Sequence, residues 1–170
     1  AFSPDGTLVV AAAFNGSVYV WHTDGTATVR QFPASKASMH DAKITPDNKN
    51  IVGINAEGLL ICWNAETGDV IGSVETGGKF SGLAIVAGGQ HVVIRTSESK
   101  TELRKIPTLE LVAQSPGAVA GIAGDGSFYA TIDGSVAHVF ASQNGTPVGE
   151  PLDHGSPIQS MAVDAASHRI

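Results

Sequence analysis

The sequence has a single cysteine, few aromatic residues and no excess of basic residues, and each shortage removes a class of protein. One cysteine leaves no partner for an internal disulfide. Ten Lys and Arg stand against 16 Asp and Glu, so no basic footprint for nucleic acid or an anionic membrane is present. No apolar run approaches the roughly 18 residues of a membrane-spanning helix. What remains, 42% hydrophobic residues with 20 Gly and 8 Pro, suits an all-β domain with many turns.

The residue types that usually carry chemistry are scattered. No two of the six histidines show the helical i, i+4 spacing or the Cys/His clustering of a metal site. Cys62 lies between Ile61 and Trp63 in an expected strand, where a buried cysteine behaves as a small apolar residue; a reactive thiol is the alternative. The sequence therefore predicts no catalytic residue, no metal and no cofactor. The histidines are His22, His40, His91, His138, His154 and His168.

Residues 1–21 provide the template from which the rest of the chain can be understood. Ser3-Pro4-Asp5-Gly6 has the chemistry of a tight turn, since Pro presets φ and Gly tolerates positive φ. Leu8 to Ala13 is an apolar run of strand length. Asn15-Gly16 is a strong signal for a two-residue hairpin, and Ser17 to Trp21 follows as a strand rich in β-branched and aromatic residues.

The landmarks of this template return at a constant interval. Thr45-Pro46-Asp47-Asn48, Gly58 and Trp63 each lie 42 residues after their counterparts in the first copy. A third copy is degraded and has Arg104 where the tryptophan is expected. A fourth is clearer, with Gly124-Asp125-Gly126 followed by the hairpin turn Asp133-Gly134. A period near 40 with four strands per unit is typical of the blades of a β-propeller.

The expected fold is therefore all-β, with blades of four antiparallel strands. We expect about four blades and the start of a fifth, forming an open arc cut from a larger propeller, because the chain enters and leaves the template inside a strand. The whole chain, 1–170, is one such unit. The expected blades cover residues 1–32, 40–75, 80–114 and 118–150, with another starting at 157–170; strands are expected, among others, at 1–3, 147–150 and 157–163.

These repeats resemble the WD-repeat family of β-propellers in Phe-Ser-Pro-Asp-Gly at 2–6 and Val-Tyr-Val-Trp at 18–21. The segment 145–154 is similar to the linker between blades in bacterial members and places His154 at the family's Gly-His position. The resemblance makes Trp21, Trp63, Phe140 and His154 structural repeat positions, with both tryptophans buried and equivalent. His22 and Asn64 follow the tryptophans where the family has Asp, so its buried hydrogen-bond network is expected to be absent or partial.

What the resemblance implies about function is a non-catalytic scaffold that binds other proteins, or other domains of the same parent chain. The alternative is an enzymatic or small-ligand-binding propeller with its site at the central channel. That alternative needs polar residues converging from the innermost strands, and residues 39–44, 80–85, 118–123 and 158–163 are mostly apolar.

Binding is expected at the loops that join the second and third strands of each blade, together with the linkers between blades. The third blade carries an enlarged, charged loop at 97–102, which predicts either a binding feature or a solvated hairpin tip. The candidate partner-binding residues are the charged ones on these loops: Glu57, Lys79, Glu98, Lys100, Glu102 and Asp133.

Overall fold

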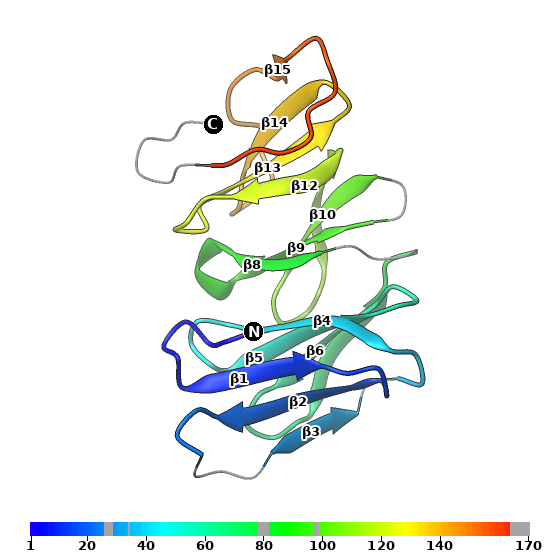
Figure 1. Cartoon of the computed structure of the whole chain (residues 1–170), viewed down its shortest axis with the longest axis vertical. Helices are drawn as coiled ribbons and strands as arrows, with labels where there is room; N and C mark the ends of the chain where they lie inside the picture. The colour runs from blue at the N-terminus through cyan, green and yellow to red at the C-terminus, as the bar shows by residue number, and fades with distance from the viewer. Residues whose placement is uncertain (26–28, 34, 78–81, 97–98, 164–170) are drawn as a thin grey trace.

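The computed structural model consists of four antiparallel sheets that follow one another in chain order along the long axis of the molecule (Figure 1). It describes residues 1–25, 29–33, 35–77, 82–96 and 99–163. Each sheet is formed by strands consecutive in sequence, as in propeller blades. The chain is therefore all-β, as the sequence predicts.

The strands keep sequence order within their sheets. Sheet 1 contains β1 (Leu8–Ala12), β2 (Ser17–His22) and β3 (Arg30–Pro33). Sheet 2 contains β4 (Met39–Ile44), β5 (Asn50–Asn55), β6 (Leu59–Asn64) and β7 (Val70–Glu75). Sheet 3 contains β8 (Leu83–Val86), a 3-10 turn (Ala87–Gly89), β9 (His91–Arg95), β10 (Lys100–Lys105) and β11 (Leu111–Pro116). Sheet 4 contains β12 (Ala118–Ile122), β13 (Phe128–Asp133), β14 (Val136–Ala141) and β15 (Leu152–Asp153).

Strand register follows from the hairpin turns. The Asn15 side chain accepts a hydrogen bond from the Ser17 amide at 3.2 Å, and Gly16 has φ +80°, as a tight hairpin turn requires. Trp21 then pairs with Val9, and Trp63 pairs with Ile51, so the two tryptophans occupy the same register position 42 residues apart. The repeat inferred from the sequence is therefore a repeat in strand pairing as well.

The hydrophobic core lies between neighbouring sheets rather than within any one of them. Val10, Val18 and Val20 of sheet 1 pack against Ile51 and Trp63 of sheet 2. A second cluster joins sheets 2 and 3 around Val52, Leu60, Val92 and Ile94, and a third joins sheets 3 and 4 around Val93, Leu103, Tyr129 and Phe140. Each sheet is stabilised by the next, as in other repeat architectures.

Three expected strands differ in the structure. The last strand of sheet 4 is Leu152–Asp153 and not 147–150, because Pro147 and Pro151 have no amide hydrogen for a ladder; Pro147 forms only an isolated bridge with Phe140. Residues 1–3 contribute an isolated bridge between Phe2 and Val9. Residues 157–163 form no strand, and the rest of the expected fifth blade, 164–170, lies outside the described residues.

Candidate interaction surfaces

Hydrogen bonds hold the hairpin tips and the linkers between blades together on one side of the molecule. The Gly16 carbonyl accepts from the Ser35 amide at 3.3 Å, and the Ala56 amide donates to the Ser38 carbonyl at 2.9 Å. The Gly58 carbonyl accepts from both the amide and the hydroxyl of Thr76, at 2.9 and 2.8 Å. Each tip is thus fixed to the linker that leads to the next sheet.

The same arrangement continues in sheets 3 and 4. The Thr101 hydroxyl donates to the Gly117 carbonyl at 3.0 Å, and the Ser135 hydroxyl donates to Asp153 at 2.8 Å. The His154 amide donates to the Ser135 carbonyl at 2.9 Å. We call this side the loop face; it comprises the hairpin tips 14–16, 56–58 and 133–135 and the linkers 35–38, 76–77, 116–117 and 153–156.

The predicted partner-binding residues have different positions on this face. Glu57 and Asp133 are exposed at hairpin tips, and Lys100 is exposed where β10 begins. Lys79 and Glu98 lie outside the described residues. Glu102 is not in a loop at all, which corrects our expectation. β10 begins at Lys100, and residues 101–104 are all buried because sheet 3 lies between sheets 2 and 4, so Glu102 is inside the protein, 6% exposed.

Glu102 forms a buried ion pair with Arg104 on the same strand. The Arg104 Nε donates to the Glu102 carboxylate at 2.7 Å, and its Nη1 donates to the Leu109 carbonyl at 2.8 Å. Gln114 donates to the other oxygen of Glu102 at 3.1 Å. Since both charges have their hydrogen-bond partners within sheet 3, this cluster is not available to a partner protein.

Phe14 is a surface residue of the loop face that sequence reasoning missed. It sits beside the Asn15-Gly16 turn with its side chain 92% exposed. Large exposed aromatic residues are common at the centres of protein interfaces. The sequence did contain a signal for this residue: an aromatic side chain within a hairpin tip, although the turn does not need an aromatic residue to form.

On the opposite side, the turns that precede β1 and β5 use their aspartates internally. Asp5 accepts from the Ser3 hydroxyl at 2.6 Å and from the Thr7 amide at 3.0 Å; the first of these bonds contributes most to lowering the pKa of Asp5 below its ordinary value. Asp47 repeats the pattern with Thr45 and the Lys49 amide, again with a lowered pKa. These carboxylates define turns.

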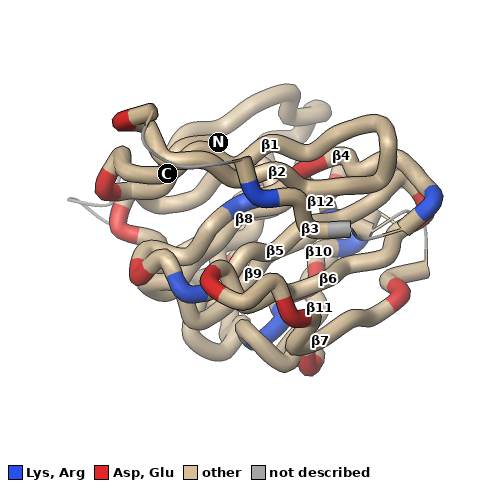
Figure 2. The backbone as a smooth tube through the Cα atoms, turned by 90° about the horizontal axis from the view of Figure 1, so that it is seen from below, with Lys and Arg blue, Asp and Glu red and all other residues tan. Residues whose placement is uncertain are grey.

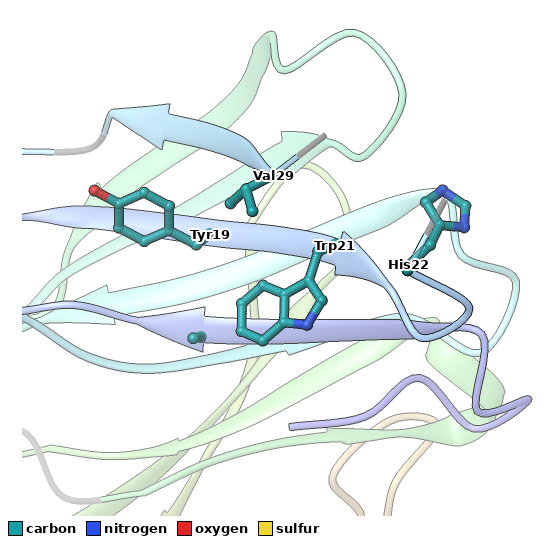
Figure 3. Close-up of a pocket in the computed structure, with 6 residues that line it drawn as sticks. Tyr19, Trp21, His22 and Val29 are labelled. Atoms are coloured by element: carbon teal, nitrogen blue, oxygen red, sulfur yellow. The ribbon is translucent and has the colours of Figure 1, made fainter. Parts of the chain in front are cut away.

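The face of sheet 1 that points away from sheet 2 has an apolar hollow of about 420 Å³ (Figure 3). Tyr19 and Trp21 of β2 lie along it, and Ala11, His22, Gly25 and Val29 complete its lining. Trp21 is only half-buried here, whereas Trp63 is fully buried against sheet 1. Our expectation that both indoles are buried is therefore wrong for Trp21, because its sheet has no neighbour on that side among the described residues.

Phe140, His154 and Trp63 show whether the buried hydrogen-bond network typical of WD repeats is present at the repeat positions. Phe140 is buried and stacks on Tyr129 with ring centroids 5.3 Å apart, and the Tyr129 hydroxyl bonds Ser115 at 2.8 Å. His154 is exposed in its linker, and the Trp63 Nε1 finds no hydrogen-bond partner in the described part of the chain. Packing between sheets therefore takes the place of a buried network at Trp63.

The innermost strands offer little for a channel site. β8 and β12 contain no charged residue, and on β4 the Lys43 ammonium pairs with Asp41 at 2.9 Å. Within the described ranges, no group of three or more His, Cys, Asp or Glu is placed to hold a metal ion, and no helix has the length and apolar character to cross a bilayer. Both basic and acidic positions are spread along the backbone (Figure 2), and acidic residues outnumber basic ones by 16 to 10 in the sequence.

Together, the sheets and their order define a chain with the fold of a β-propeller. No protein-family model matches it. Among curated proteins it is similar to eukaryotic translation initiation factor 3 subunit I of Brugia malayi, 24% identical over 92 residues, which are 54% of this chain and 28% of that protein. A solved chain from "Crystal Structure of Mitotic Checkpoint Complex" superposes with a TM-score of 0.75 and 16% identity.

The superposition covers 94% of this chain and 52% of the solved chain, so this chain spans about half the length of the propeller that it matches. The two comparisons support a distant relationship to propellers of the WD-repeat type. They give no support to the narrower placement among bacterial members, which stays a prediction from residues 145–154.

Proposed function

We propose that this chain is a non-catalytic propeller unit that binds other proteins, or other domains of its own parent chain, through the loop face. The observation that carries the proposal is the set of hydrogen bonds between hairpin tips and linkers, such as that from Thr76 to the Gly58 carbonyl at 2.8 Å. A surface fixed in this way loses little conformational entropy when it binds a partner.

The loop face also has the chemical variety that an interface needs. Phe14 supplies a large apolar contact at 92% exposure, and Glu57 and Asp133 supply separate negative charges. Gly16, Gly58 and Gly134 supply the positive φ of these turns. The Asn15 and Asn55 side chains accept hydrogen bonds from turn amides in the first two. A partner with an apolar pocket and nearby basic groups would fit this face.

The same reasoning disfavours an enzymatic or ligand-binding site at the channel. Such a site needs converging polar groups, and β8 and β12 contribute aliphatic residues, alanine and glycine. The ion pair of Asp41 and Lys43 is satisfied internally on β4. β12 is half-exposed along its whole length, and the residues that it presents are apolar or glycine.

The proposal is tested by capturing partners with a variant of the loop face. Phe14→Ala, Glu57→Ala and Asp133→Ala are combined, and capture of proteins from the source cell by the full chain is compared with wild type. The matched control replaces exposed charges on the opposite side, Lys49→Ala with Glu66→Ala. We expect the first variant to lose specific partners and the control to retain them. Loss of capture only in the control, with both variants folded, would overturn the proposal.

A further inference from the structure

The last strands of sheets 2 and 3, and the corresponding segment of sheet 4, begin in the same way. Equivalent hydrogen bonds of 2.8, 2.9 and 2.9 Å close the turns in front of them; they run from the amides of Asn64, Lys105 and Ala141 to the carbonyls of Asp69, Glu110 and Thr146. The two residues after each turn therefore occupy equivalent positions in the three sheets. These pairs are Val70-Ile71, Leu111-Val112 and Pro147-Val148.

The equivalent positions carry exposed apolar side chains on the outer rim of the molecule, which we call the outer belt. Five of the nine large apolar side chains that are exposed in the described part of the chain belong to it. Single exposed apolar residues need no explanation, but a row of them at one level of successive sheets marks a candidate interaction surface. The outer belt consists of Val70, Ile71, Leu111, Val112 and Val148, which are 38% to 55% exposed.

Contacts between neighbouring sheets make the outer belt continuous. Gly72 follows Ile71 on β7, and a Cβ added to it would lie 2.8 Å from the carbonyl oxygen of Pro107, in the turn that leads to β11. In the same way, a Cβ added to Gly145 would collide with the side chain of Ala113 on β11. Each apolar pair thus lies close to the turn that leads to the next pair along the rim.

The edges of these outer strands are unsuited to pairing with a further strand. Ile71 is the extra residue of a bulge in β7, and Val112 is the extra residue of the same bulge in β11. In sheet 4, Pro147 has no amide hydrogen to donate to a ladder. Bulges and prolines are devices by which edge strands avoid strand addition, so a partner of the outer belt is held by side-chain contacts.

The charges beside the outer belt are negative. From the residue before each outer strand to its end, at 69–75, 110–116 and 146–153, the sequence has no Lys or Arg. Asp69 and Glu110 stand directly before two of the apolar pairs, and Glu150 lies two residues after the third; all three are exposed. Among the described residues, the carboxylates of Glu110 and Glu150 have no hydrogen bond or ion pair. The neighbouring β10 contributes one exposed base, Lys105, at its end.

We propose that the outer belt binds an amphipathic helix of a partner protein, with Lys or Arg beside the apolar stripe of that helix. A helix carries its apolar residues at i, i+3, i+4 and i+7 on one face and can lie across neighbouring sheets, whereas an added strand follows the edge of a single sheet. The basic residues of the helix then lie near Asp69 and Glu110. This surface is separate from the loop face, so one propeller unit has room for two partners.

The first test uses a synthetic peptide of about four helical turns, with leucine at i, i+3, i+4 and i+7 and lysine on both sides of that stripe. Its binding to the full chain is measured by fluorescence anisotropy, and a control peptide has glutamate in place of every lysine. We expect saturable binding of the basic peptide, weakened by added salt, and no binding of the acidic peptide. Equal binding of both peptides, or binding of neither, would overturn the proposal.

The second test locates the binding surface. Ile71→Ser with Val112→Ser removes two equivalent belt side chains without changing the charge and should weaken binding of the basic peptide at least about tenfold. Glu110→Gln with Glu150→Gln keeps the outer belt and should weaken binding about threefold at low salt, as expected for exposed charge pairs. The matched control, Phe2→Ser, removes a 70% exposed apolar side chain beside β1, at the edge of sheet 1 opposite its outermost strand.

Peptide binding should be unchanged in this control, and circular dichroism establishes that all the variants keep their sheets. Binding that survives the change at Ile71 and Val112, or that falls equally in Phe2→Ser, would place the peptide elsewhere and overturn the proposal.

Discussion

The Arg104 guanidinium lies 2.7 Å from the Glu102 carboxylate at the place where the preceding sheet carries Trp63. Glu102 likewise stands where that sheet has Ile61, and both side chains point to the interface between sheets 2 and 3. One repeat thus fills this position with an indole, and the next fills it with an ion pair supported by Leu109 and Gln114. Equivalent positions of two successive sheets are thus filled by apolar side chains in sheet 2 and by an ion pair in sheet 3.

Removing one member of this pair should be costly. Arg104→Ala leaves the Glu102 carboxylate buried without its cation, and we expect a loss of about 3–5 kcal/mol in the free energy of unfolding. The exposed neighbour Lys105→Ala is the matched control and should cost less than about 0.5 kcal/mol. Urea unfolding monitored by circular dichroism measures both.

Replacing both charges by the residues of sheet 2 should have the opposite outcome. Glu102→Ile with Arg104→Trp restores the apolar pattern of Ile61 and Trp63, and we expect a double variant at least as stable as wild type, because apolar replacements of buried ion pairs are often neutral or stabilising. A double variant less stable than Arg104→Ala would show that the pair is required for packing at this interface.

The two tryptophans should differ sharply in their contribution to stability. Trp63 is fully buried between sheets, so Trp63→Ala should cost about 3–5 kcal/mol. Trp21 is half-buried on the face of sheet 1 that points away from sheet 2, and Trp21→Ala should cost clearly less. Acrylamide quenching of Trp21→Phe and Trp63→Phe separates the two indoles; equal quenching of both would contradict this assignment.

The sequence predicts a turn or a strand well where the residues of that segment alone determine its conformation. Asn15-Gly16 and the strands 17–22 and 50–55 appear in the structure as expected, because turn chemistry and alternation act over a few residues. The burial of Glu102 and the exposure of Trp21 are not local properties. The first depends on the neighbouring sheets that cover both faces of sheet 3, and the second depends on whether another sheet lies alongside sheet 1. A pattern of residues along one strand contains neither fact.

Gly16 and Gly6 provide a matched pair for testing how the loop face is held. Both have positive φ, +80° and +72°, so alanine at either position costs about 1–2 kcal/mol for backbone strain. At Gly16 an added Cβ would also collide with the Ser35 carbonyl, whereas at Gly6 it meets open space. We expect Gly16→Ala to be the more destabilising by at least about 1 kcal/mol. Equal thermal midpoints would mean that the linker at 35–38 moves aside freely.

His91 should make the stability of the fold depend on pH. Burial lowers the pKa of His91 below its ordinary 6.5, with a smaller contribution from the charge of Lys105, and its Nδ1 has no hydrogen-bond partner among the described residues. The folded state therefore favours the neutral ring, while the unfolded chain takes up the proton at higher pH. Stability is at its full value above 6.5, falls as the pH is lowered through 6.5, and levels off below the folded pKa.

The test compares the free energy of unfolding at pH 7.5 and pH 5.5 for wild type and His91→Leu. Leucine cannot be protonated, so the variant should lose less stability between the two values than wild type does, whatever its stability at pH 7.5. Taking the difference between the two proteins cancels the contributions of the other histidines, which are unchanged. A histidine resonance assigned to residue 91 that titrates at or above 6.5 in the folded protein would contradict the prediction, because the ring would then be as well solvated as in the unfolded chain.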